Sequence, residues 1–152
     1  AEGTFYHYFK SKNELLRDRL YRSNRDITAY FDRELAELEE IDALKKFVLF
    51  LLDYAKSRVV EVHTCYLKAM LDNYEEWNLA TEQMIDVLLR KLVADGQAKG
   101  RVSQAYGVDQ IVDFIQCYFS GVVYNQCLSR GIFMEKTGSA ALMLNWIEGL
   151  RA

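Results

Sequence analysis

Proline is absent from all 152 residues of this sequence. Because proline interrupts helices and marks loops and strand edges, its absence favours long helices without breaks. Hydrophobic residues make up 51% and charged residues 27%, which is the composition of a folded domain and excludes a disordered chain. The sequence therefore predicts an all-α protein of one domain, or of one domain with a small addition.

Cysteine and histidine are scarce, with three and two residues respectively. Cys117 and Cys127 lie on one expected helix, roughly 15 Å apart at the rise of an α-helix, so they cannot pair with each other. We therefore expect reduced thiols of the core type. His63 and Cys65 are two residues apart and lie on different faces of a helix, so we predict no metal site. Glycine-rich phosphate loops and nucleophile motifs are also missing, so we expect neither a cofactor nor an enzyme.

The sequence also lacks an apolar stretch long enough to span a bilayer. The amino end is polar and carries no apolar signal segment. The most apolar segment, residues 108–128, still contains five polar side chains: Asp109, Asp113, Gln116, Asn125 and Gln126. We therefore predict a cytoplasmic protein that does not enter a membrane.

The net charge of −3 argues against a surface that binds nucleic acid everywhere. Its distribution is uneven. Residues 1–25 carry six basic and three acidic side chains, a balance of +3, which leaves −6 for the rest of the chain. A basic amino end is thus joined to an acidic body.

The spacing of apolar residues predicts the helices in turn. Ser11 followed by Glu14 matches a capping box, which predicts a long helix over residues 11–40. Asp42 is expected to cap the next helix, in which residues 47–52 are apolar on every side and therefore central. Further helices are expected over residues 63–73, 75–95, 109–130 and 139–151, with stop signals at Gly96, Gly100 and Gly131.

The last two of these helices carry more apolar faces than one small subunit can cover. We therefore predict a homodimer joined through them, with Gly121 allowing a neighbouring backbone to come close. The expected interface residues are Phe119, Gly121, Val122, Leu142, Trp146 and Ile147.

A set of aromatic and sulfur-containing side chains comes from all the middle helices. Each one alone is typical of an ordinary core, but together they suit a mostly apolar pocket with a few hydroxyl groups. The expected ligand-binding residues are Phe47, Phe50, Tyr54, Tyr66, Met70, Trp77, Met84, Phe114, Cys117 and Tyr118. The acidic body and the aromatic faces favour a small hydrophobic ligand that is neutral or cationic.

Residues 3–16 read GTFYHYFKSKNELL. This stretch resembles the end of the recognition helix and the start of the following helix in TetR-family transcriptional regulators. The family pattern there is a small residue, an apolar-Tyr pair, two further residues with an aromatic, then Phe, Lys, a polar residue, Lys and an acidic-Leu-Leu end, and all fourteen positions fit it. Over the rest of the chain the resemblance is one of helix layout.

The resemblance implies that this segment holds DNA phosphates, contacts that position a protein on DNA without reading its sequence. The start of the following helix also favours an anion through its dipole. The implied DNA-binding residues are Thr4, Tyr6, His7, Tyr8 and Lys12. The alternative is that the aromatic residues of this segment are only the core of a small helical subdomain.

In the family, two helices precede the recognition helix, and the 152 residues begin within or just before that third helix. Because a helix-turn-helix is stable as a three-helix cluster, these residues alone are not expected to bind an operator. The resemblance implies that residues 1–40 are the end of a DNA-binding head with its connecting helix. Residues 41–152 are then the ligand-binding and dimerisation domain of a TetR-like helical bundle.

The function implied by the resemblance is a ligand-responsive transcriptional regulator, by default a repressor. A small hydrophobic inducer would favour one arrangement of the dimer, and the long helix over residues 11–40 would transmit the change to the operator-binding head. The alternative is a helical dimer that binds an apolar ligand or a protein partner and never contacts DNA.

Overall fold

The computed structural model describes residues 11–57, 60–72, 82–133 and 138–152. Among these residues an isolated bridge between Val102 and Arg151 is the only β-type pairing, so the all-α prediction is confirmed. None of the described helices is long and apolar enough to cross a membrane. Six helices are described: α2 (Lys12–Glu34), α3 (Glu40–Lys56), α4 (Val60–Asp72), α6 (Glu82–Ala98), α7 (Val108–Leu128) and α9 (Ser139–Glu148).

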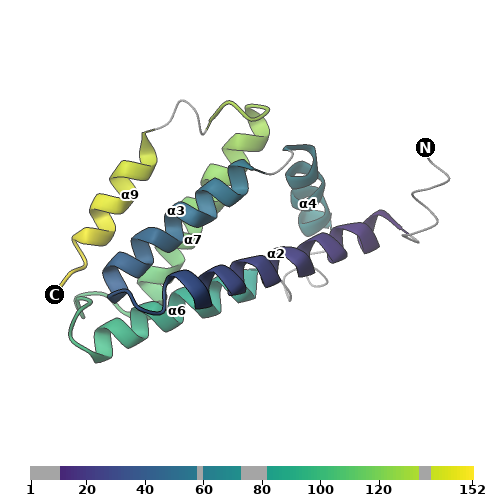
Figure 1. Ribbon diagram of the computed structural model, residues 1–152. Helices are drawn as coiled ribbons and strands as arrows, with labels where there is room; N and C mark the ends of the chain where they lie inside the picture. The colour runs from purple at the N-terminus through teal and green to yellow at the C-terminus, as the bar shows by residue number, and fades with distance from the viewer. Residues whose placement is uncertain (1–10, 58–59, 73–81, 134–137) are drawn as a thin grey trace.

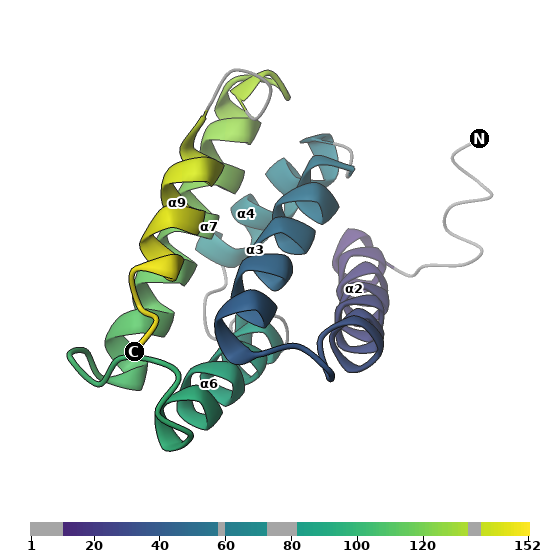
Figure 2. The ribbon, with the colours of Figure 1, turned by 60° about the vertical axis from the view of Figure 1, so that its left-hand side comes forward.

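Helix α3 lies at the centre of the molecule, packed against α6, α7 and α9. Figure 2 shows it between α9 on one side and α2 on the other. Ile41, Leu44 and Phe47 on this helix have no exposed surface, which confirms the predicted central position. The apolar run is not enclosed on every side, however, because Leu49 is 40% exposed. Burying side chains of this size stabilises a fold by roughly 1.5–3 kcal/mol each, so α3 carries much of the core.

Helix α2 is the predicted long helix, and it runs along one side of the molecule against α6 and α4 (Figure 1). Its start agrees with the prediction, since Ser11 Oγ accepts a hydrogen bond from the backbone N–H of Glu14 at 3.1 Å. Its end was predicted too late, because the helix stops at Glu34. Leu35 and Ile41 are both buried, and the chain has to turn between them to bring both into the core.

The predicted cap at Asp42 is wrong by three residues. Helix α3 begins after Glu39, and Asp42 lies in its first turn, where a negative charge still favours the helix dipole. The helix predicted over residues 75–95 begins at Glu82 among the described residues, and residues 73–81 lie outside them.

Gly96 was predicted as a helix stop, but it lies inside α6 and serves packing. A Cβ atom there would be 2.4 Å from Cγ2 of Val102 and 3.0 Å from Cβ of Glu40, so only glycine lets these two segments come so close. The helix instead ends before Gly100, whose φ of +67° favours glycine. Gly131 was predicted to cap a helix that reaches Arg130, but α7 ends at Leu128 with Ser129 as its C-cap, and Gly131, with φ of +95°, follows two residues later.

The three cysteines are unpaired, as predicted. The prediction that they are core residues is wrong, because Cys117 is exposed and the other two are half-buried. Cys117 faces outward because the buried face of α7 is supplied by Ile111, Val112 and Ile115.

A buried carboxylate fixes the start of α3 against the end of α6. Glu40 is buried, and its Oε1 accepts a hydrogen bond from Lys99 Nζ at 2.6 Å, while Arg101 donates to Oε2 at 3.4 Å. Burial alone would raise the pKa of Glu40, but the hydrogen bond from Lys99 and the two positive charges outweigh it and hold the pKa below its ordinary value.

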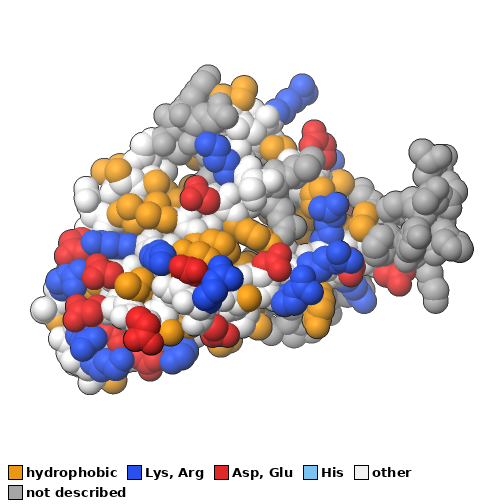
Figure 3. Space-filling model, viewed as in Figure 1, with side chains coloured by type: hydrophobic (Ala, Val, Ile, Leu, Met, Phe, Trp, Pro, Cys, Tyr) orange, Lys and Arg blue, Asp and Glu red, His pale blue; other side chains and the backbone are white. Residues whose placement is uncertain are grey.

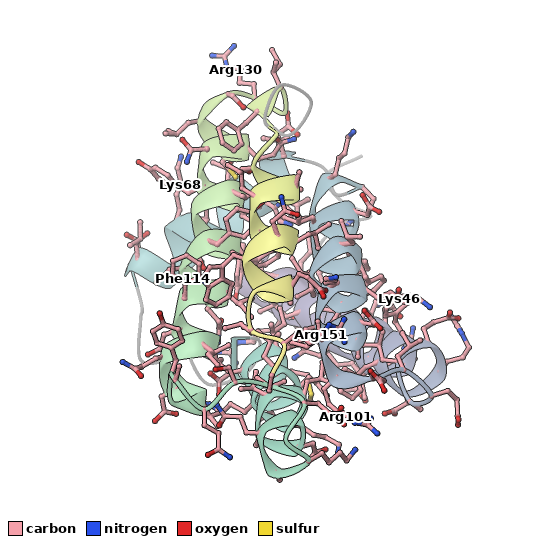
Figure 4. All side chains as sticks on the ribbon, turned by 90° about the vertical axis from the view of Figure 1, so that its left-hand side faces the viewer. Lys46, Lys68, Arg101, Phe114, Arg130 and Arg151 are labelled. Carbon is pink, nitrogen blue, oxygen red and sulfur yellow. The ribbon has the colours of Figure 1, made fainter. Side chains whose placement is uncertain are left out.

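The carboxyl end of the chain joins the same charged cluster. Arg151 lies 3.1 Å from Asp42 and 2.7 Å from Glu148, and Lys45 also pairs with Glu148. Arg151 and Lys45 lower the pKa of Glu148 to about 2. Figure 3 shows interleaved acidic and basic side chains over this end of the molecule, and Figure 4 places Arg101 and Arg151 close together there. Three segments distant in sequence are thereby held together.

We expect Glu40→Gln to lower the free energy of unfolding by about 1–2 kcal/mol near neutral pH, because charge-assisted hydrogen bonds to a buried group are lost. The folded state has the lower pKa, so this stabilisation is present above the unfolded-state pKa and is lost as the pH falls through the folded-state pKa. Urea unfolding at several pH values should show the gap between variant and wild type closing in acid. The control is Glu39→Gln, an exposed neighbour, which should cost less than about 0.5 kcal/mol. Equal losses in the two variants would contradict this role of Glu40.

Candidate functional site

A cavity of about 210 Å³ lies between α2, α3, α4, α6 and α7. Each of its main walls turns one helical face inward. On α2 that face is Leu16, Leu20, Ser23 and Ile27, which follow one another at four, three and four residues. On α4 and α7 the lining residues also recur at three and four. The cavity is therefore built from regular helix faces and not from loops.

The polar side chains of the lining are mostly held by neighbours. Tyr54 donates its hydroxyl to Oδ2 of Asp26 at 3.3 Å, so its ring faces the cavity while its oxygen is bound outside. Ser23 Oγ donates to the carbonyl oxygen of Arg19 at 2.8 Å. Gln116 Nε2 donates to Oδ1 of Asp86 at 3.0 Å. These bonds fix the walls and leave the cavity predominantly apolar.

The formal charges at the cavity are few. Arg19 is the only lysine or arginine in the described lining, and no aspartate or glutamate belongs to it. His63 also lines the cavity from α4. Within the described residues, no group of three histidine, cysteine or acidic side chains could hold a metal ion.

Three of the predicted ligand-binding residues come together here: Tyr54, Tyr66 and Met70 all line the cavity. Phe119, predicted for the dimer interface, lines it as well. The reason is the rotation of α7, which turns Phe119 toward α4 and away from the surface expected to meet another subunit.

The structure places three other predicted ligand-binding residues in or against the core. Phe47 is fully buried, with its ring centre 5.4 Å from that of Phe31 in an edge-to-face contact. Phe50 stacks on Tyr30 at 3.7 Å, and Met84 packs against the core from α6. None of these three belongs to the described lining of the cavity.

Two further predicted ligand-binding residues, Phe114 and Tyr118, contact α9 from α7. Phe114, which is labelled in Figure 4, contacts Trp146 with ring centres 4.4 Å apart. The Tyr118 hydroxyl lies 3.1 Å from Oγ of Ser139. Cys117 is exposed on the same helix. Trp77 lies outside the described residues.

The predicted interface residues divide in the same way. Val122 and Ile147 are buried within the subunit, so they are not available to a partner. Leu142 is 72% exposed, and Gly121 has open space where a Cβ would stand. Trp146 is half-buried beside Phe114.

An exposed row on α7 was not predicted as a set. It consists of four exposed residues, Phe114, Cys117, Tyr124 and Leu128, together with the half-buried Gly121, and we call these five residues the α7 stripe. Its members are separated by three, four, three and four residues, which is the spacing of a coiled-coil seam. The signal was present in the sequence, but the many apolar residues on the other faces of this helix concealed it.

The cavity residues contributed by α2 were also missed. Ser23 interrupts an otherwise apolar face of this helix, and such a small polar residue on a buried face was the available signal. Of the implied DNA-binding residues, Thr4, Tyr6, His7 and Tyr8 lie outside the described residues. Lys12 is the first residue of α2, and its side chain is not described.

We expect substitutions that fill the cavity to be tolerated. Ala55→Leu on α3 adds volume at the lining, so the free energy of unfolding should stay unchanged or rise by about 1 kcal/mol. Ala43→Leu on the same helix is the matched control, because Ala43 is fully buried in the core away from the cavity. Overpacking there should cost about 1–3 kcal/mol in urea unfolding. If Ala55→Leu costs as much as Ala43→Leu, the space beside Ala55 is not a usable cavity.

Comparisons with protein-family models, curated proteins and solved structures found no match for this chain. The function therefore has to be argued from the cavity, the exposed stripe and the sequence of residues 3–16.

Proposed function

We propose that this chain is the ligand-binding and dimerisation part of a TetR-like transcriptional regulator. A small hydrophobic molecule occupies the cavity and changes the position of α2. That helix carries the change to a DNA-binding head, since residues 1–40 comprise the end of the head and the helix that connects it to the body. By default, such a regulator represses transcription, and binding of the ligand relieves the repression.

The observation that carries this proposal is that α2 forms one wall of the cavity. Leu16, Leu20 and Ile27 line it, and the same helix begins at Lys12, inside the segment that resembles the family motif. A ligand that contacts these side chains acts directly on the helix that follows the motif. A shift of this one helix against its neighbours is then enough to couple ligand binding to the DNA-binding head.

The α7 stripe supports the dimeric part of the proposal. Phe114, Tyr124 and Leu128 are each about half or more exposed, and Leu142 on α9 adds a fourth large apolar side chain. A row at coiled-coil spacing can pack against the same row of a second copy, because a two-fold interface uses one patch twice. Gly121 lies at the middle of the row and has open space beside it, so the helix of a second copy could approach the backbone closely there.

The dimer can be tested by light scattering at micromolar concentration. We expect the wild type to have twice the mass of one chain, and Leu142→Glu and Gly121→Leu to have the mass of one chain. The first variant buries a charge in the interface, and the second holds the two backbones apart. Tyr21→Glu on α2 is the control, because Tyr21 is even more exposed but lies outside the stripe. A monomeric wild type, or a control that dissociates equally, would rule out this interface.

DNA binding can be tested in a protein that carries two further helices ahead of residue 3. Lys12→Ala should weaken binding to all DNA sequences about equally and reduce the slope of log affinity against log salt by about one, because one phosphate contact is lost. Mobility shifts at several salt concentrations measure both effects. A changed sequence preference would contradict the phosphate role of Lys12. Absence of any DNA binding would favour the alternative of a dimer that never contacts DNA.

A further inference from the structure

One arginine belongs to the described lining of the cavity, and it is exposed to solvent. Arg19 on α2 and Ser120 on α7 are the exposed members of the described lining, so the cavity reaches solvent beside them. The side chains behind them are mainly leucine, isoleucine, valine and aromatic residues. The described lining therefore combines mainly apolar side chains with one exposed arginine, Arg19.

That guanidinium group is not paired within the described part of the chain. Two other arginines of α2 form ion pairs with aspartates of the same helix. Arg22 lies 2.9 Å from Asp18, and Arg25 lies 3.6 Å from Asp26. No such ion pair includes Arg19 among the described residues. A planar guanidinium group in this position can bind a carboxylate with two parallel hydrogen bonds.

The rest of the lining favours an anion over a cation. Ser23, Tyr54 and Gln116 already donate hydrogen bonds to neighbours, and the second lining residue able to carry a positive charge is His63. No described lining residue offers a carboxylate to a ligand ammonium group. A cationic ligand would lose its hydration without a charged partner, which is costly in an apolar site.

We propose that the cavity binds a compact amphipathic carboxylate, with its apolar body inside and its carboxylate on Arg19. This inference rests on the proposed ligand-binding function and names the ligand class. The volume of about 210 Å³ limits the apolar body, since a cavity of about 150 Å³ is known to hold benzene. The acidic net charge of the body favoured a neutral or cationic ligand, but charges at the entrance act at much shorter range and outweigh it.

The position of Arg19 gives the ligand charge a role in signalling. Arg19 lies on α2, seven residues after Lys12, so a carboxylate held there is attached to the helix that leads from the DNA-binding motif. The apolar body contacts α4 and α7 at the same time. An uncharged molecule of the same shape would fill the cavity but would not form the ion pair with Arg19 on α2.

The test uses three compounds with the same chain and different head charge: octanoate, 1-octanol and octylammonium. Calorimetric titration of the 152-residue chain should give an affinity for octanoate roughly tenfold or more above that for octanol, with octylammonium weakest. Arg19→Gln should make octanoate and octanol equal, and Arg19→Glu should make octylammonium the tightest of the three. Arg22→Gln, on the same helix but outside the lining, should leave the order unchanged.

The outcomes separate this inference from the proposed function. If octanol and octanoate bind wild type equally, or octylammonium binds best, the carboxylate preference is wrong while the cavity remains a binding site. If none of the three binds, and Ala55→Leu also behaves as an overpacked core variant, the ligand-binding function itself fails. Arg19→Lys keeps the positive charge and should therefore retain a reduced preference for octanoate over octanol. If Arg19→Gln loses the preference and Arg19→Lys keeps part of it, the loss is due to the missing charge and not to misfolding.

Discussion

The orientation of helix α7 about its own axis determines which of its side chains lie in the core, at the cavity and on the exposed surface. One face, with Ile111 and Ile115, enters the core against α3 and α6. A second face, with Phe119 and Val123, turns to the cavity. The third face is the α7 stripe. Because successive residues of a helix are 100° apart, fixing the core face fixes the other two as well. Packing of the core thus determines which side chains are left for a ligand and for a partner.

The charges of the molecule fall into two groups with different roles. At one end Glu40, Arg101 and Arg151 hold together segments from the middle and the end of the chain, and each has a partner of opposite charge. This cluster lets α3 and α6 approach closely at Gly96. At the cavity, Arg19 stands beside apolar walls without an ion-pair partner among the described residues. The first group stabilises the fold, and the proposed role of the second is recognition.

The cavity and the α7 stripe lie on different faces of the same helix, so the proposed ligand site and the proposed dimer interface are adjacent. Tyr118 lies between the stripe and the core face of α7, and its hydroxyl is 3.1 Å from Oγ of Ser139 on α9. A ligand that moves α7 would shift the stripe by the same amount, because a packed helix moves as a unit. In the proposed regulator, ligand binding in the cavity can thus act in two ways: it can move α2, and it can change the packing of the dimer interface.

Sequence alone determined the helical class, the start of α2 at Ser11 and the central position of α3, since these follow from local capping and from apolar periodicity. It also determined that residues such as Tyr54, Tyr66 and Met70 could share a pocket. The sequence could not distinguish the cavity face of α7 from its exposed face, because both faces are largely apolar. The helical period of 3.6 residues shows which residues share a face but not which neighbouring element that face contacts. The end of α2, the role of Gly96 and the position of Arg19 at the cavity were decided by tertiary packing, since each depends on contacts between segments far apart in the chain.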